Sequence, residues 1–205
     1  TYYFKISSVN SAGESSPTLP VSALTLCSPP NSLSKVTITD NSCLFSWNAS
    51  SGASSYTIYK STTSGGPYSL LDTTTGTSYS AGGLNFSTSY FFKVSALNGS
   101  GESVLSSSLC VTTLPSAPTG FSAQVLTSSS IALSWNSVSS AENYMVYASL
   151  SNGVLPLVKT TTALSCTLSS LQYNTNYYFQ VRTDDGISTS SASSRISAQT
   201  LTQPV

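Results

Sequence analysis

The side chains that could carry chemistry here include four cysteines, two tryptophans and seven acidic residues, but no histidine. Without histidine the chain cannot build an ordinary Ser-His-acid triad. No Cys-x-x-Cys pair occurs, which also disfavours a zinc site. Seven acids spread over 205 residues offer no convergent carboxylate pair for glycoside hydrolysis. We therefore expect a non-enzymatic chain with no catalytic, cofactor-binding or metal-ligating residues and no cofactor.

Asp184 and Asp185 are the only adjacent carboxylates in the sequence. A calcium ion takes six or more oxygen ligands, which this pair alone does not supply. Gly186 follows them, and Asp-Gly favours tight turns. The sequence therefore predicts a turn at this point rather than a metal site.

Trp47 and Trp135 could act as platforms on which a sugar ring stacks. Each ends a trio at period two, Cys43-Phe45-Trp47 and Ile131-Leu133-Trp135, and this alternation places one face of a strand inward. We therefore expect both indoles in a core.

Tyr59 and Tyr147 fall on the opposite strand face from Tyr56 and Tyr144. They could be exposed binding rings. Packing of these rings across a sheet surface is the simpler expectation.

Four cysteines allow three complete disulfide pairings, but their positions do not recur in a repeating pattern. Cys43 stands where the other copy has Ile131, and Cys166 stands where the other copy has Tyr79. We therefore expect both cysteines to be small buried hydrophobic residues. A Cys43–Cys110 bridge is conceivable, although strand alternation points Cys110 outward. The default expectation is unpaired thiols. The cysteines are Cys27, Cys43, Cys110 and Cys166.

The elements that position these side chains repeat along the chain. Tyr2 and Tyr90 are 88 residues apart, Tyr90 and Tyr177 are 87 apart, and Trp47 and Trp135 are 88 apart. Such a period is too long for a solenoid repeat but suits a small β-sandwich domain of about 100 residues. The chain therefore reads as two complete copies preceded by part of a third.

Composition excludes several classes of partner. The chain is 39% hydrophobic and 10% aromatic, which is enough for real cores, but only 7% charged with zero net charge. Nucleic acid requires a basic surface, so we expect no nucleic-acid partner, and an anionic membrane is disfavoured for the same reason. No apolar run reaches the length of a membrane helix, so no membrane insertion is expected. Serine and threonine replace charges on exposed faces, as is common in secreted bacterial proteins.

The chain divides into three regions with about seven short strands in each complete copy and no helical periodicity. Residues 1–28 hold the last two strands of an incomplete domain, and residues 29–115 and 116–205 are complete domains. The predicted fold class is all-β, with antiparallel β-sandwiches in tandem.

These motifs together resemble the fibronectin type III domain. The resemblance implies a sandwich of a three-stranded and a four-stranded sheet, with Tyr90 and Tyr177 as tyrosine corners tied to nearby backbone. The sequence lacks Arg-Gly-Asp, so integrin binding does not carry over, and Gly101 has no counterpart in the second copy. The motifs are Pro30 and Pro118, Trp47 and Trp135, Tyr56 to Tyr59 and Tyr144 to Tyr147, Leu84 to Val94 and Leu171 to Val181, and Asn98 to Ser103.

The leading functional hypothesis is a semi-rigid extracellular or cell-surface spacer, stalk or fibre, with self-association or neighbouring domains as protein partners. One alternative is an accessory region of a secreted carbohydrate-active enzyme whose catalytic domain lies elsewhere, which would add carbohydrate as a partner. Another is an adhesive module, or a filament subunit assembled through the 1–28 hairpin. That hairpin is expected to be completed upstream in the same polypeptide, or by a neighbour's sheet edge. Glycosylation sequons begin at Asn48, Asn85 and Asn98.

Overall fold

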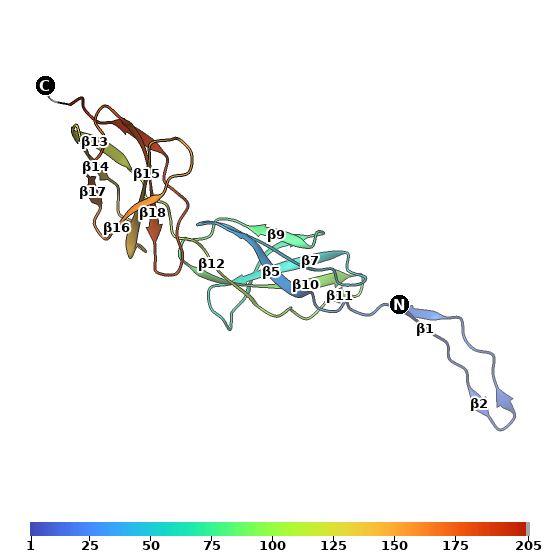
Figure 1. The fold of residues 1–205 in the computed structure, drawn as a ribbon. Helices are drawn as coiled ribbons and strands as arrows, with labels where there is room; N and C mark the ends of the chain where they lie inside the picture. The colour runs from blue at the N-terminus through green and yellow to red at the C-terminus, as the bar shows by residue number, and fades with distance from the viewer. Residues whose placement is uncertain (204–205) are drawn as a thin grey trace. The chain divides into compact units, whose positions relative to one another are not determined.

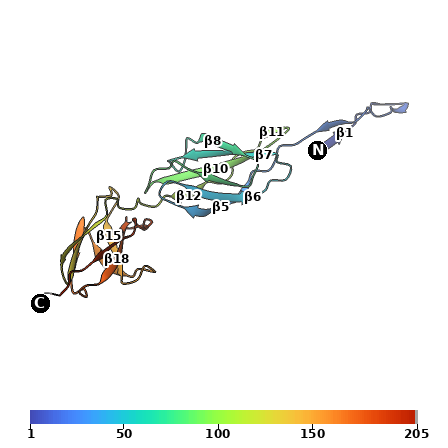
Figure 2. The same ribbon diagram turned by 90° about the horizontal axis from the view of Figure 1, so that it is seen from above.

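A computed structural model describes residues 1–203, and these residues contain strands but no helix (Figures 1 and 2). No helix long and apolar enough to cross a membrane is therefore present in that part of the chain. The predicted all-β class is confirmed. Three groups of antiparallel strands follow one another along the chain: an N-terminal hairpin, a first repeat and a second repeat.

The second repeat is a sandwich of two antiparallel sheets, of three strands (β13-β14-β17) and four strands (β16-β15-β18-β19). Alternation explains the packing, because the inward residues of β14 and β18 are buried while their neighbours are half-exposed or exposed. Ile131, Leu133, Phe179 and Val181 are fully buried and hold the sheets together. The strands are β13 (Ser122–Thr127), β14 (Ser130–Ser134), β15 (Asn143–Ser149), β16 (Leu157–Thr161), β17 (Ser165–Leu168), β18 (Asn176–Asp184) and β19 (Ile196–Gln199).

The first repeat has the same two-sheet plan, with β5-β6-β9 in one sheet and β11-β10-β7-β8 plus β12 in the other. It has one strand more than the seven predicted, because its last strand is split into β11 and β12. The residues between these two strands bond through serine hydroxyls, which interrupts the regular ladder. The strands are β5 (Asn31–Ile38), β6 (Cys43–Asn48), β7 (Ser55–Ser61), β8 (Ser69–Thr74), β9 (Ser78–Ala81), β10 (Ser89–Asn98), β11 (Gly101–Glu102) and β12 (Leu109–Thr112).

The N-terminal hairpin consists of β1 paired with β4 and β2 paired with β3. It has four short strands rather than the two strands that the sequence pattern predicts. All the residues in these strands are exposed. The strands are β1 (Tyr2–Phe4), β2 (Val9–Asn10), β3 (Gly13–Glu14) and β4 (Val21–Ala23).

The last turn differs between the repeats, as the sequence predicts. Asn98 pairs with Gly101 across a two-residue turn, and Gly101 has a φ of +127°, a conformation that favours glycine. In the second repeat Asp184 instead bridges to Thr189, which leaves a longer loop. The N-terminal hairpin repeats the shorter form, since Asn10 pairs with Gly13.

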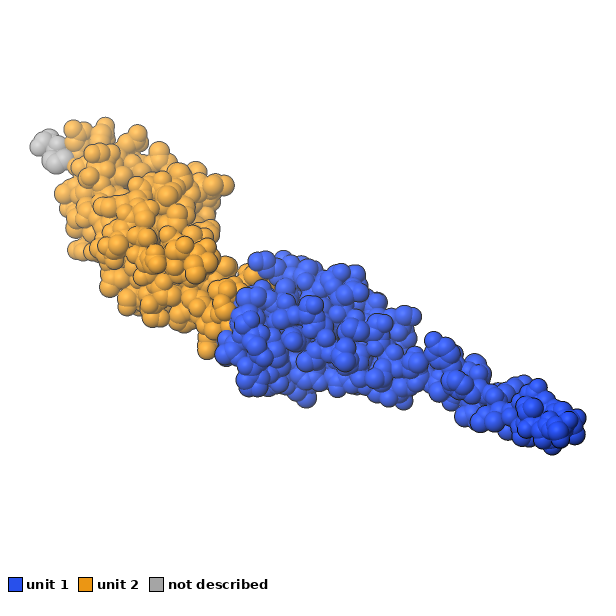
Figure 3. Space-filling model, turned by 90° about the horizontal axis from the view of Figure 1, so that it is seen from below, with its two compact units in different colours: residues 1–36, 44–80, 90–111 blue, residues 37–43, 81–89, 112–205 orange. Residues whose placement is uncertain are grey.

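Contacts divide the chain into two compact units (Figure 3). The first unit contains the N-terminal hairpin and most of the first repeat. The second contains all of the second repeat together with residues 37–43, 81–89 and 112–115 of the first.

Candidate functional site

Both tryptophans are core residues, as predicted, and neither is a sugar platform. Trp47 is 5% exposed and Trp135 is 4% exposed. Each ring lies 5.5 Å, centroid to centroid, from a tyrosine on the next strand along the chain, which belongs to the other sheet: Tyr56 in the first repeat and Tyr144 in the second. The matched geometry makes these pairs parts of the scaffold.

Tyrosine hydroxyls tie loops to the core. The Gln172 amide donates to the Tyr177 hydroxyl at 2.9 Å, which confirms the predicted tyrosine corner in the second repeat. Tyr90, its counterpart, is also buried. The structure adds a second anchor that the sequence reasoning missed, because the Val138 amide donates to the Tyr144 hydroxyl at 2.9 Å.

Tyr59 and Tyr147 pack on the outer sheet faces, as expected. The Tyr59 hydroxyl donates to Glu102 at 2.6 Å. This hydrogen bond, with smaller contributions from burial and from the carboxylate charge, raises the pKa of Tyr59. Tyr147 instead lies under the Arg182 guanidinium, 5.7 Å from its ring centroid. The two matched rings therefore face opposite charges.

A set of hydroxyl bridges was missed by sequence reasoning. Ser190 and Ser193 are buried, and their hydroxyls accept from the amides of Thr183 and Val181 at 2.9 and 3.0 Å. These bonds replace regular strand pairing near the last strand. The signal was present as hydroxyl residues recurring at the 87–88 residue period, namely Ser15, Ser103 and Ser190, and Thr18, Ser106 and Ser193.

The burial of the cysteine side chains agrees with the sequence prediction. Cys43 and Cys166 are buried as predicted, and Cys110 is exposed. Among residues 1–203 all four cysteines are thiols, so the Cys43–Cys110 disulfide is not formed. Burial raises the pKa of the Cys166 thiol, and Lys159 opposes that shift.

The Asp184-Asp185-Gly186 segment forms a turn, as predicted. Burial would raise the pKa of Asp185, but hydrogen bonds from the Ser188 and Ile187 amides prevail and lower it. No group of three or more possible metal-ligating side chains occurs within residues 1–203.

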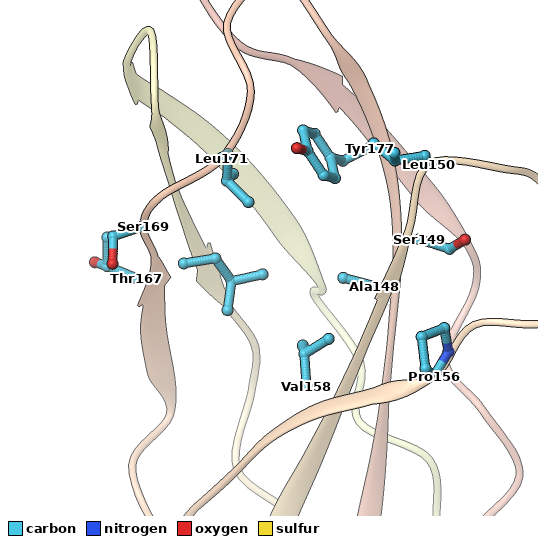
Figure 4. Close-up of a pocket in the computed structure, with 10 residues that line it drawn as sticks. Ala148, Ser149, Leu150, Pro156, Val158, Thr167, Ser169, Leu171 and Tyr177 are labelled. Atoms are coloured by element: carbon cyan, nitrogen blue, oxygen red, sulfur yellow. The ribbon is translucent and has the colours of Figure 1, made fainter.

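A crevice of about 630 Å³ opens between the sheets of the second repeat (Figure 4). Its walls are mainly aliphatic, with the Tyr177 ring above Ala148 and Val158. In the first repeat the counterpart of Ala148 is Lys60, whose ammonium lies 5.5 Å from the centroid of Tyr90. The short side chain of Ala148 thus leaves open the space that a lysine side chain takes up in the first repeat.

Comparison with known proteins identifies the repeat. The family model for the fibronectin type III domain matches residues 28–112 and 116–199. A two-domain fibronectin type III segment of chicken tenascin superposes with a TM-score of 0.51, covering 83% of this chain and 99% of that structure at 19% identity. This likeness supports the fold.

Two curated bacterial proteins are similar in sequence. Chitinase A1 of Niallia circulans is 32% identical over 202 residues, which cover 89% of this chain. Exoglucanase B of Cellulomonas fimi is 29% identical over 231 residues, which cover 98% of it. The chain spans only 27% and 20% of these two relatives, respectively. The family match over both repeats, together with the sandwich topology, shows that the chain belongs to the fibronectin type III domain family.

Proposed function

We propose that this chain is a non-catalytic accessory region of a secreted, polysaccharide-degrading enzyme, in which the tandem sandwiches act as a spacer. The observation that carries this proposal is the similarity, over nearly the whole chain, to parts of a chitinase and an exoglucanase. The absence of histidine from the chain supports a non-catalytic role. The chemistry would lie in a catalytic domain outside these residues, and the location would be extracellular.

We propose the domain boundaries 1–28, 29–115 and 116–205, with the first region holding the last two strands of a further domain. Pro115 and Pro118 stand at the junction between the complete domains. Proline fixes its own φ and lacks an amide donor, which limits bending of a short connection. A spacer with stiff joints would hold a catalytic domain away from its neighbours.

A filament subunit that assembles through the hairpin is the second candidate. The observation that favours it is the exposure of Tyr2, Phe4 and Ile6 at 61%, 57% and 73%. Sedimentation velocity over a range of protein concentrations tests this candidate. Assembly that disappears when residues 1–26 are deleted would support it, and a concentration-independent monomer would contradict it.

The spacer proposal is tested in the natural polypeptide that carries these residues. One variant lacks residues 29–202, and a second replaces them with a flexible Gly-Ser linker. We expect both variants to hydrolyse soluble oligosaccharides normally and insoluble chitin or cellulose several-fold more slowly. Equal hydrolysis of the insoluble substrate by all three proteins, or a natural polypeptide without hydrolase activity, would contradict the proposal.

A further inference from the structure

The second repeat has a hollow of about 370 Å³ on the outer face of its four-stranded sheet. Its volume lies in the range of small-molecule sites. The only two arginines of the chain, Arg182 and Arg195, both line it. The other lining residues are Tyr147, Gly153, Val154, Leu155 and Gln180.

Arg195 is fixed in place by three hydrogen bonds. Its Nη1 donates to the backbone oxygen of Asn152 at 2.5 Å and to the Oδ1 of Asn152 at 2.7 Å. Its Nη2 donates to Oε1 of Gln180 at 3.3 Å. A guanidinium has five N–H donors, so donors remain for a ligand.

Arg182 is held in a different way. Its guanidinium carbon lies 5.7 Å from the centroid of the Tyr147 ring, and its Nη1 donates to the backbone oxygen of Ser190 at 3.2 Å. Stacking and a single backbone bond position the group while leaving most of its donors unused. Two guanidinium groups are therefore ordered before any ligand arrives, which lowers the entropic cost of binding.

In the described part of the chain neither arginine is held by an ion pair, although Asp40 lines a second hollow together with Arg182. The described contacts of Arg182 and Arg195 are with backbone carbonyls, amide oxygens and an aromatic ring, and within residues 1–203 neither contacts a carboxylate. In a chain with only 7% charged residues, two guanidinium groups that line one hollow and contact no carboxylate form an anion-binding arrangement.

The first repeat shows which anion fits such a position. There the carboxylate of Glu102, on β11, accepts from the Tyr59 hydroxyl at 2.6 Å and from the Ser95 hydroxyl. The first repeat thus supplies its own carboxylate to the outer face of this sheet.

The counterparts in the second repeat keep the ring but lose the acid. Tyr147 replaces Tyr59, Arg182 replaces the hydroxyl donor Ser95, and Thr189 replaces Glu102. Backbone pairing supports the last match, since the bridge between Asp184 and Thr189 corresponds to the pair formed by Leu97 and Glu102. The second repeat thus lacks the carboxylate acceptor of Glu102, and a guanidinium group, that of Arg182, replaces the hydroxyl donor of Ser95.

We propose that this hollow binds the carboxylate of a uronate sugar, with Arg182 and Arg195 donating to its oxygens. The volume exceeds that of a carboxylate alone, so a sugar ring can also enter the hollow, beside the buried Leu155 and the exposed Val154. The choice of a sugar as the carrier rests on the proposed function.

The test is a titration of the whole chain with sodium glucuronate, in which the chemical shifts of the backbone amides report binding. Glucose, which lacks the carboxylate, is the matched control ligand. We expect saturable shifts confined to the hollow with glucuronate, and at least tenfold weaker binding of glucose. Arg182→Met and Arg195→Met should each weaken glucuronate binding about tenfold or more.

Two further variants make the result specific. Thr189→Glu installs the acid of the first repeat beside Arg182, with which Thr189 lines a second hollow, and should weaken glucuronate binding about tenfold by pairing with Arg182. Lys159→Met removes the other cation of the second repeat, which lies outside the hollow, and should change the affinity less than twofold. Amide spectra of the free variants report whether each one remains folded.

Equal binding of glucose, or an equal loss of affinity in Lys159→Met, would overturn the proposal. Binding of N-acetylglutamate as tight as glucuronate would also overturn it, because the site would then recognise acidic side chains rather than sugars. Hydrolysis of chitin or cellulose uses neutral substrates, so its outcome is independent of this titration. Failure of the uronate site can thus be distinguished from failure of the spacer proposal.

Discussion

The N-terminal hairpin and the last strands of the second repeat follow one sequence pattern but reach opposite degrees of burial. Both begin with alternating aromatic and aliphatic residues and return through a serine-rich segment. Tyr2, Phe4 and Ile6 are 61%, 57% and 73% exposed, whereas their counterparts Tyr177, Phe179 and Val181 are 8%, 0% and 0% exposed.

The difference in exposure shows that strand pairing and burial of side chains have separate requirements. Alternation and turn residues are sufficient for β1 to pair with β4, because that pairing needs only backbone donors and acceptors. Burial requires the opposing sheet, which β13, β14 and β17 supply in the second repeat. Full burial of each large apolar side chain contributes about 1.5–3 kcal/mol, so the same sequence pattern is far more stable within a sandwich.

Replacing the buried Phe179 should cause the largest loss of stability. We expect Phe179→Ala to lower the free energy of unfolding of the second repeat by about 3–5 kcal/mol, since it leaves a cavity in a close-packed core. Phe4→Ala should change the stability of either repeat by less than about 0.5 kcal/mol. Urea unfolding followed by resolved amide signals of each repeat measures both. A large effect of Phe4→Ala on a repeat would show that the hairpin is packed in solution.

The buried hydroxyl bridges give a smaller contrast. Ser190 is 1% exposed and accepts from the Thr183 amide, so Ser190→Ala leaves that donor unsatisfied. We expect a loss of about 1–3 kcal/mol and faster amide exchange at Thr183. Ser15→Ala removes the matching bond to the Ser8 amide in the exposed hairpin, where water replaces it. An equal loss of stability in the two variants would contradict this account.

The sequence predicts the scaffold well because its signals are local and periodic. Alternation places Trp47 and Trp135 inward, and the 87–88 residue period locates the repeats. The split of the last strand into β11 and β12 was not predicted, because it depends on serine hydroxyls that bond to the neighbouring strand. A serine at a strand edge gives no indication, by its type alone, that its hydroxyl faces inward.

The candidate site was not predictable in the same way. Arg182 and Arg195 are 13 residues apart and lie on different strands or their flanks, so their convergence follows only from strand pairing. Tyr147 was identified as an outer-face ring, but its cation is visible only in the folded chain. Matching the two repeats residue by residue could have revealed the change from Glu102 to Thr189.

The two-residue turns of the hairpin and of the first repeat share a backbone conformation but differ in their surroundings. Gly101 and Gly13 have φ values of +127° and +133°, so alanine at either position costs about 1–3 kcal/mol in backbone strain. An added Cβ at Gly101 would also lie 3.3 Å from Cδ2 of Leu26, whereas an added Cβ at Gly13 would have no heavy atom of residues 1–203 within 4 Å outside its chain neighbours. We expect Gly101→Ala to destabilise the first repeat in urea unfolding. Gly13→Ala should affect only amide exchange within the hairpin, and destabilisation of the repeat by Gly13→Ala would contradict the expectation.

The smallest expected effect concerns the acid beside this turn. Glu14 and Glu102 are matched, and each accepts from a matched serine, Ser7 or Ser95. Only Glu102 also accepts from a tyrosine, because the strand that carries Tyr59 has no counterpart in the hairpin. We expect Glu102→Gln to lower the pKa of Tyr59 towards its usual value of about 10, and Glu14→Gln to leave it unchanged.

The sign of the linked stability follows from the raised pKa of Tyr59. Folding favours the neutral phenol, so this contribution is fully present below the unfolded pKa of about 10 and is lost as the pH rises through the higher folded pKa. Tyrosinate absorbance, taken as the difference between the parent chain and Tyr59→Phe, isolates this titration from the other tyrosines. A Tyr59 pKa that is the same with and without the Glu102 carboxylate would show that the hydrogen bond between them does not persist in solution. The contrast between the complete repeat and the hairpin would then rest on apolar burial alone.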